Sequence, residues 1–156
     1  MSEVLCDKKI GEGLKGNIYK SVVRTAFVYG GEGWPVKKIQ EKKMGVAEMK
    51  MLWWKLVKTR RDRIRNDLIR ERAGVTIVSN KIQEKSLQWF GHVRHRNENY
   101  VGRRIELLKV DGRRGRGQPK RRWKDCGAED LRKKGLGEED PMDRNDWRRK
   151  VRNIDG

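Results

Sequence analysis

The chain is predicted to be mainly α-helical, with a helical bundle followed by a basic Gly/Arg-rich loop and C-terminal helices. Apolar residues recur at spacings of three and four along most of its 156 residues, and glycines separate these stretches. Six tryptophans need a core that buries them. Because 35% of the residues are hydrophobic and 40% are charged, we expect that core to be thin and interrupted by solvated stretches.

The N-terminal half is predicted to hold two amphipathic helices. The first carries the apolar stripe Leu14, Ile18, Val22, Ala26 and Tyr29, and the glycines at 30, 31 and 33 end it. The second begins near Pro35, which suits a first helical position. It carries the strongest helical signal of the chain, with heptad positions Ile39, Val46, Met49, Trp53 and Leu56 and one polar exception, Lys42. We expect this stripe to pack within the same domain, with dimerisation as the alternative.

An arginine-rich helix is predicted over 60–72, with Ile64 and Leu68 on one face and Gly74 at its end. Its acidic residues, Asp62, Asp67 and Glu71, are expected to pair with basic neighbours three or four positions away. Two interpretations remain open for this segment. It is either a solvated helix with internal ion pairs or a helix whose uncompensated arginines follow a phosphate backbone.

The C-terminal half is predicted to be helical as well. Ser79 is a candidate cap for a helix from 80 to about 95, with Ile82, Trp89 and Val93 inward and Leu87 and Phe90 beside them. Residues 100–110 fit a short helix or a strand. A helix over 121–134 is anchored by Trp123 and Leu131, and glycines at 135 and 137 end it. The acidic residues 138–140 precede Pro141 and predict the start of a last helix, which carries Trp147, Val151 and Ile154.

The charge of the chain predicts a polyanionic partner, RNA and/or DNA. Lys and Arg number 40 against 22 Asp and Glu, for a net charge of +18 and a pI near 10.3. Residues 111–123 concentrate this charge, with six basic side chains on a glycine-rich backbone and no acidic residue between Asp111 and Asp125. Each Lys or Arg that neutralises a phosphate releases counterions, so such a segment gains by binding nucleic acid. Its Arg-Gly-Arg core at 114–116 fits a minor-groove hook, and a flexible linker is the alternative.

Other functional classes have little basis in the sequence. No apolar run is long enough to span a bilayer, so no membrane partner is expected, and nothing indicates secretion. Two histidines three apart, His92 and His95, with a distant Cys126 do not make a zinc site, and no metal or other cofactor is predicted. We expect His92 to be packed or hydrogen-bonded near a helix end. No catalytic residue is assigned, because Glu41, Lys42 and Lys43 lie on a predicted helix and not on the strand edge of a nuclease.

Several blocks of the chain, in the same order, resemble one family. They are 5–10, 14–20, 22–26, 29–37, 46–52, 59–66, Trp89-Phe90-Gly91-His92-Val93, and Arg116-Gly117-Gln118-Pro119-Lys120-Arg121-Arg122-Trp123. This pattern is similar to the region after the polymerase palm in non-LTR (LINE-type, RTE-like) retrotransposon endonuclease and reverse transcriptase proteins. Where the family has a second arginine in the loop this chain has Gln118, and such changes are typical of a decaying genomic copy.

The resemblance implies a thumb-like helical region and a tail that help to hold template RNA and target DNA. It divides the chain into an N-terminal remnant of the region after the palm (1–13), a helical thumb-like region (14–96), a basic linker and loop (97–122) and a C-terminal helical segment (123–156). It also implies a nuclear location, or a cytoplasmic ribonucleoprotein before import. Because the chain contains no Asp-Asp pair for two-metal polymerisation, we expect the palm and fingers to lie upstream and the fragment to be no enzyme. Those missing domains are a further expected partner.

The predicted nucleic-acid-binding residues are mostly arginines in three segments. They are Arg60, Arg61, Arg63, Arg65, Arg103, Arg104, Arg113, Arg114, Arg116, Lys120, Arg121, Arg122 and Trp123. Trp123 is included because it adjoins the basic loop, whereas the other tryptophans lie on predicted apolar faces and are expected to pack in a core. Two other outcomes remain open. The chain is an interaction module that pairs through the 39–56 helix, or it is a remnant with no function.

Overall fold

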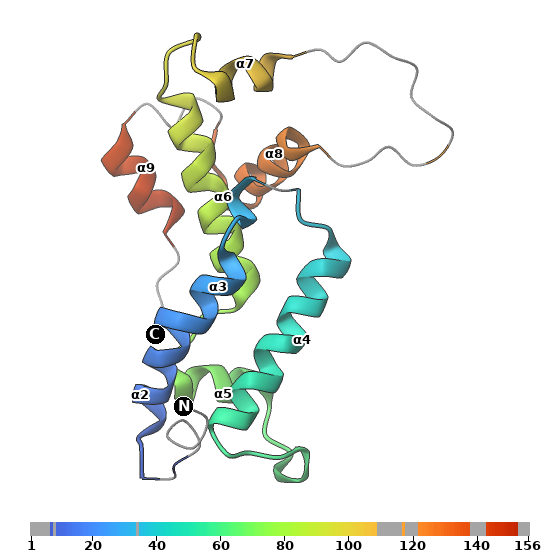
Figure 1. Ribbon diagram of the computed structural model, residues 1–156, viewed down its shortest axis with the longest axis vertical. Helices are drawn as coiled ribbons and strands as arrows, with labels where there is room; N and C mark the ends of the chain where they lie inside the picture. The colour runs from blue at the N-terminus through green and yellow to red at the C-terminus, as the bar shows by residue number, and fades with distance from the viewer. Residues whose placement is uncertain are drawn as a thin grey trace. The chain divides into compact units, whose positions relative to one another are not determined.

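The computed structural model describes residues 7, 9–33, 35–108, 117, 122–137 and 143–152, and these residues form helices and connecting turns with no strand (Figure 1). The predicted mainly α-helical fold is therefore confirmed. The elements in chain order are α2 (Glu12–Ile18), a π-helical turn (Tyr19–Val23), α3 (Arg24–Val28), a 3-10 turn (Gly31–Gly33), α4 (Lys38–Lys55), a 3-10 turn (Arg60–Asp62), α5 (Asn66–Ala73), α6 (Val78–Arg94), α7 (Val101–Leu107), α8 (Trp123–Lys134) and α9 (Arg144–Val151). Among the described helices, none is long and apolar enough to cross a membrane.

The chain divides into two compact units, and the division falls within α6. The first comprises 1–29, 38–82 and 153–156, and the second comprises 30–37 and 83–152. The four-part division expected from the sequence stays a prediction, because compactness does not test which segments fold independently.

The core of the first unit lies where α2, α4 and α5 meet. Its buried cluster consists of Tyr19, Met49, Leu52, Leu56, Ile69, Ala73 and Val75. A Cβ atom at Gly16 would overlap the backbone carbonyl of Ala73, so glycine is needed there for α2 to approach α5 this closely. Gly74 ends α5 in the left-handed conformation, as the sequence predicted.

The apolar stripe predicted for the first helix does not form the buried face. Leu14, Val22 and Tyr29 are exposed, whereas Lys15, Gly16 and Tyr19 are buried. Lys15 and Gly16 already face inward in α2, before the π-helical turn at Tyr19–Val23, because α2 packs there against Ala73 of α5.

Helix α4 begins at Lys38, so Pro35 is not its first residue as predicted, and only the C-terminal part of its heptad stripe is inward. Met49 and Leu56 are buried and Trp53 packs against the core, whereas Ile39 and Val46 are exposed. The prediction of a continuous apolar seam was therefore wrong. Two charged side chains, Glu48 and Lys55, are buried on this helix, and an apolar periodicity cannot identify such residues.

The predicted 60–72 helix is interrupted. Arg60–Asp62 forms a single 3-10 turn and α5 begins only at Asn66. Asp62 accepts hydrogen bonds from the backbone N–H of Thr59 (2.6 Å) and from its hydroxyl, and these bonds lower the pKa of Asp62. Ile69 and Ala73 are the buried residues of α5, and Leu68 is exposed, contrary to the prediction. The expected ion pair of Asp67 is present, with Arg70 at 3.8 Å.

The second unit packs α6, α8 and α9 around a second core. The buried cluster is Leu87, Phe90, Leu131, Trp147 and Val151, with Trp123 and Leu136 packed against it. The indole Nε1 of Trp147 donates to the carbonyl of Leu87 (3.0 Å), and the amide of Gln83 donates to Asp130 of α8 (3.1 Å). These bonds fix α8 and α9 against α6.

Several helix boundaries in the C-terminal half of the chain refine the sequence predictions. Residues 101–107 are helical, which settles the choice between helix and strand. Helix α6 begins at Val78, one residue before the predicted cap Ser79, and α9 begins after Asp143, whose carboxylate accepts from Asn145 and Asp146 N–H. Residues 138–142 and Ile154 lie outside the described residues. Trp89 is exposed and not inward; it stacks on His92, with ring centroids 5.2 Å apart.

Candidate nucleic-acid interface

The basic loop that gave the strongest sequence signal is mostly outside the described part of the chain. Five of its predicted binding residues lie outside the described residues: Arg113, Arg114, Arg116, Lys120 and Arg121. Their role stays a prediction. Arg122 is exposed just before α8. Trp123 is half-buried and its ring lies 6.0 Å from that of Phe90, which is the packing of a core residue.

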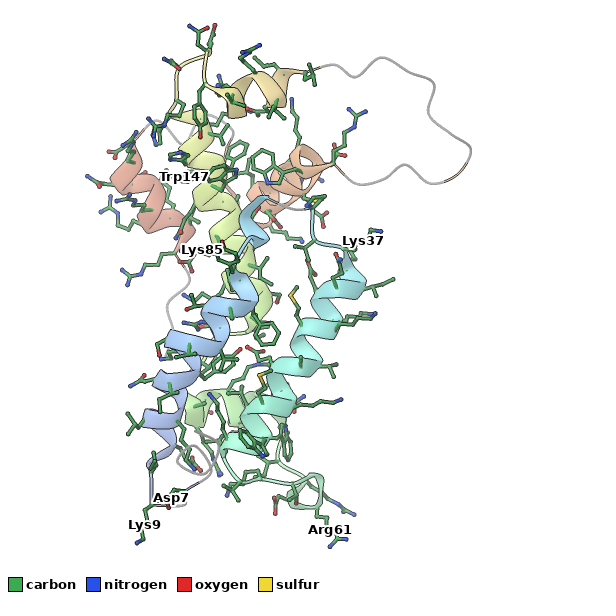
Figure 2. All side chains as sticks on the ribbon, viewed as in Figure 1. Asp7, Lys9, Lys37, Arg61, Lys85 and Trp147 are labelled. Carbon is green, nitrogen blue, oxygen red and sulfur yellow. The ribbon has the colours of Figure 1, made fainter. Side chains whose placement is uncertain are left out.

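In the 60–65 segment, Arg61, Arg63 and Arg65 are exposed. Arg61 and Arg63 form no ion pair with another described residue, and Figure 2 shows Arg61 pointing away from the helices. The backbone of Arg63 is left-handed, with φ of 46°, a conformation that non-glycine residues rarely adopt. Arg65 pairs with the exposed Asp67 at 3.3 Å, and the side chain of Arg60 lies outside the described residues.

The two predicted arginines of α7 differ sharply. Arg103 lies 3.3 Å from the carboxylate of Glu106, whose side chain is only 3% exposed and which also pairs with Arg94 at 2.8 Å. Because Arg103 is paired with Glu106 inside the protein, its guanidinium is less available for a phosphate. Arg104, one residue further, is exposed and forms no ion pair with another described residue.

A groove on the first unit brings basic and aromatic side chains together. It has a volume of 860 Å³ and runs along α4, past the segment after it, to α5. Its lining residues are Lys42, Gly45, Val46, Met49, Lys50, Trp53, Trp54, Lys58, Asn66 and Arg70. Among the described residues no acidic side chain lines it, and Lys42 and Lys50 have no ion-pair partner there.

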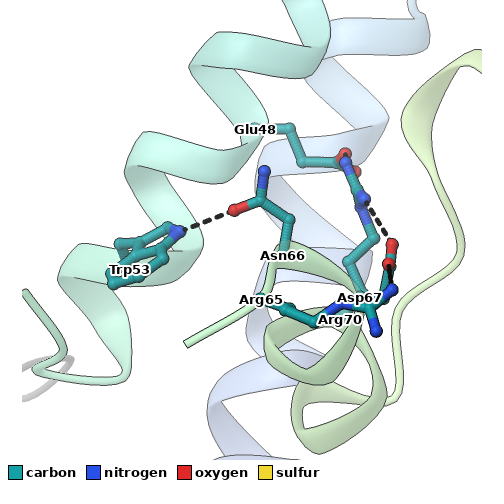
Figure 3. Close-up of polar contacts among 6 residues, drawn as sticks. All are labelled: Glu48, Trp53, Arg65, Asn66, Asp67 and Arg70. Atoms are coloured by element: carbon teal, nitrogen blue, oxygen red, sulfur yellow. Dashed lines mark hydrogen bonds and ion pairs between the residues drawn. The ribbon is translucent and has the colours of Figure 1, made fainter. Parts of the chain in front are cut away.

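The wall of this groove is held by specific polar contacts (Figure 3). The indole Nε1 of Trp53 donates to the side-chain oxygen of Asn66 at 3.2 Å, which joins α4 to the start of α5. The guanidinium of Arg70 donates to Glu48 at 3.3 and 3.4 Å. Glu48 is fully buried and also accepts from the hydroxyl of Tyr19 at 3.1 Å. Burial and then Glu48 raise the pKa of that Tyr19 hydroxyl, which stays protonated as the donor.

None of the groove residues is among the nucleic-acid-binding residues predicted from the sequence, and Trp54 is the one among them that a sequence signal could have indicated. Its side chain is 51% exposed, next to the packed Trp53. The adjacent Trp-Trp pair was a usable signal, because consecutive residues of a helix point about 100° apart, so one of two adjacent tryptophans tends to lie further from the core. An exposed indole among lysines can stack on a nucleic-acid base while the ammonium groups contact phosphates.

His92 on α6 and His95 just after that helix do not form a metal centre with the described residues around them. No group of three His, Cys, Asp or Glu side chains in the described ranges is placed to hold a metal ion. His92 is packed at the end of α6, between Trp89 and the ring of Tyr100, as the sequence predicted. Glu41, Lys42 and Lys43 lie on α4, the helix expected for them.

Comparison with known proteins gives no relative: no protein-family model, no curated protein and no solved structure matches the chain. The resemblance to retroelement proteins therefore stays a prediction from the sequence blocks quoted above.

Proposed function

We propose that this protein is a nucleic-acid-binding C-terminal fragment of a non-LTR retrotransposon reverse transcriptase. It grips template RNA or target DNA through phosphate contacts and carries no polymerase active site. The observation that carries the proposal is the groove along α4, where Lys42, Lys50 and Lys58 surround a half-exposed Trp54 and no described acidic side chain intervenes. A strand there can place phosphates on the lysines and a base on the indole.

Two further observations support phosphate binding. Arg61 and Arg63 lie in the segment between α4 and α5, exposed and without an ion-pair partner among the described residues. The chain as a whole carries +18, well above the net charge of about 2 to 8 that solubility requires of a small domain. In this proposal the loop at 113–122 adds further phosphate contacts.

The test replaces the three groove lysines together. Lys42→Gln, Lys50→Gln and Lys58→Gln should weaken binding of a single-stranded RNA and reduce the slope of log K against log [salt] by about 0.7 for each lost contact. The control is the triple variant Lys9→Gln, Lys85→Gln and Lys124→Gln, which removes the same charge from exposed positions outside the groove. Equal losses in both variants, measured by fluorescence anisotropy, would remove the groove from the interface.

The absence of polymerase activity is tested separately. Two-metal polymerisation needs paired aspartates, and the chain contains no Asp-Asp sequence. A primer-extension assay with purified protein should give no metal-dependent product. A product would contradict this part of the proposal.

A second candidate function is an interaction module that pairs through α4. It is favoured by Ile39 and Val46, which are 67% and 56% exposed on that helix. Gel filtration over a range of concentrations separates the two candidates. Concentration-dependent dimers with no affinity for RNA or DNA would favour pairing.

A further inference from the structure

A second concave site lies in the second unit, between α6 and α9. It has a volume of 370 Å³ and is lined by Glu84, Gln88, Gly91, His92, His95, Arg144, Trp147, Arg148 and Arg152. Its floor is closely packed. A Cβ atom at Gly91 would overlap the indole of Trp147, whose Nε1 is bonded to the Leu87 carbonyl, so α6 and α9 are held in contact here.

Three arginines line this cleft from one element. Arg144, Arg148 and Arg152 are spaced by four residues, so they follow one face of α9 and its C-terminal end. None of them forms an ion pair with another described residue. The acidic residue of α9, Asp146, is engaged by Arg149 and Lys150 at 2.9 Å each, and these contacts lower its pKa. The basic side chains that face the cleft are thus distinct from those that neutralise the helix.

The other wall supplies a donor and a single carboxylate. The Nε2 atom of His95 is buried and has no hydrogen-bond partner. Burial and then Arg144 lower the pKa of His95, so the ring is neutral at pH 7, a state in which Nε2 can carry the hydrogen. Glu84, the one acidic lining residue among those described, accepts a hydrogen bond from the amide of Gln88 at 3.1 Å. Three guanidinium groups therefore face one carboxylate that is already hydrogen-bonded.

We propose that the α6–α9 cleft binds a phosphate monoester, with Arg144, Arg148 and Arg152 clamping its oxygens and His95 Nε2 donating to one of them. Guanidinium groups match phosphate oxygens in geometry and charge, and a buried ring nitrogen without a partner is satisfied by such an oxygen. A monoester carries up to two negative charges at neutral pH, which suits the excess of arginine better than a singly charged diester. The volume is that of a small-ligand site and admits a phosphate with part of its ester group.

The phosphate has two possible sources, a small molecule or the 5′ end of a nucleic-acid strand. The probes are inorganic phosphate and one short single-stranded RNA prepared with a 5′ phosphate and with a 5′ hydroxyl. The variant is Arg148→Gln, and the matched control is Arg149→Gln on the same helix, whose side chain is 80% exposed and paired with Asp146. Both changes remove one positive charge, so a general charge effect cancels between them.

Arg148→Gln should weaken binding of inorganic phosphate about tenfold, while Arg149→Gln leaves it unchanged, because one charge-assisted hydrogen bond is lost only in the first. Arg152→Gln is the second test variant and should act as Arg148→Gln does. Near-ultraviolet circular dichroism of the packed tryptophans verifies that each variant is folded. Equal affinities for phosphate in Arg148→Gln, Arg152→Gln and Arg149→Gln would overturn the proposal.

The paired RNAs identify the source. Tighter binding of the 5′-phosphorylated strand, lost in Arg148→Gln, assigns the cleft to strand ends. Tight inorganic phosphate binding with equal affinity for the two RNAs assigns it to a small phosphate ester. This inference does not rest on the proposed function. If the protein binds phosphate but not RNA, the proposed function alone is overturned. If it binds RNA but not phosphate, this inference alone is overturned.

Discussion

Two charged residues of α4 are buried in the first unit, and their surroundings differ. Glu48 has no exposed surface and is satisfied by Tyr19 and Arg70. Lys55 is 3% exposed, and its ammonium has no hydrogen-bond partner; it lies 5.4 Å from the centre of the Tyr19 ring. A buried charge destabilises the fold unless it has a partner. Glu48 therefore helps to hold the first unit together, whereas Lys55 lowers its stability.

Removing the partner of Glu48 should destabilise the protein strongly. Arg70→Met leaves a fully buried carboxylate without its cation, and we expect the free energy of unfolding to fall by about 3 kcal/mol. Arg65→Met is the control, because Arg65 pairs with Asp67 in solvent, where such pairs contribute at most about 1 kcal/mol. Urea unfolding followed by circular dichroism measures both. Similar losses in the two variants would show that the Glu48 pair is not structural.

Replacing Lys55 should stabilise the protein in a pH-dependent way. Burial lowers the pKa of Lys55 below 10.5, so between its folded pKa and 10.5 the unfolded chain binds more protons and stability rises with pH. Lys55→Met removes this titrating group, and we expect it to raise the free energy of unfolding at pH 7 by on the order of 1 kcal/mol. The difference from the native chain should shrink as the pH approaches about 10. Tyr19 is present in both proteins, so the contribution of its raised pKa to stability cancels in the difference between them. A variant that is less stable at every pH would show that the cation–ring contact outweighs desolvation.

At the scale of elements, the sequence predicted most helices and the residues that end them. Gly74 and Gly135 stop α5 and α8 in the left-handed conformation that glycine adopts without strain. The predictions that failed were those of the face that each N-terminal helix buries. Gly16 is inward because α2 packs against Ala73 of α5, and Glu48 is inward because of Tyr19 and Arg70, which lie 29 and 22 residues away. A local periodicity contains no information on such distant partners.

The candidate interface could be predicted only in part. Clustered arginines indicated 60–65 and 103–104, but the ion pair that occupies Arg103 depends on the burial of Glu106, which the helical periodicity of α7 does not reveal. The groove along α4 combines residues from both sides of a turn. Its assembly depends on the Trp53–Asn66 contact and on where α5 begins, so spacing along the chain could not predict it.

The exposed indole of α4 provides a prediction for the groove itself. Trp54→Ala should weaken binding of single-stranded RNA by about 1 to 3 kcal/mol, because base stacking on the ring is lost. Binding of duplex DNA should change little, since its bases are already stacked on one another. The matched control is Trp89→Ala, which removes another partly exposed tryptophan, one that stacks on His92 outside the groove. An equal loss in both variants, or an equal loss for RNA and duplex, would exclude stacking on Trp54.

At the scale of the whole molecule, charge dominates. An excess of 18 positive charges on 156 residues opposes compaction, and internal ion pairs such as Arg70–Glu48 and Arg103–Glu106 neutralise only some of the arginines. The remaining exposed cations, in the groove, in the 60–65 segment and on α9, lie on both units. A polyanion that binds several of them should therefore also stabilise the folded chain, by mass action.

The salt dependence of nucleic-acid binding by the intact chain tests the central claim most directly. Affinity for single-stranded RNA and duplex DNA is measured by fluorescence anisotropy from about 50 to 200 mM salt. Phosphate contacts by the uncompensated cations predict a straight line of log K against log [salt] that falls by about 0.7 per contact on the single strand and 0.9 on the duplex. No binding to either nucleic acid at the lowest salt, or an affinity that does not change with salt, would contradict the account.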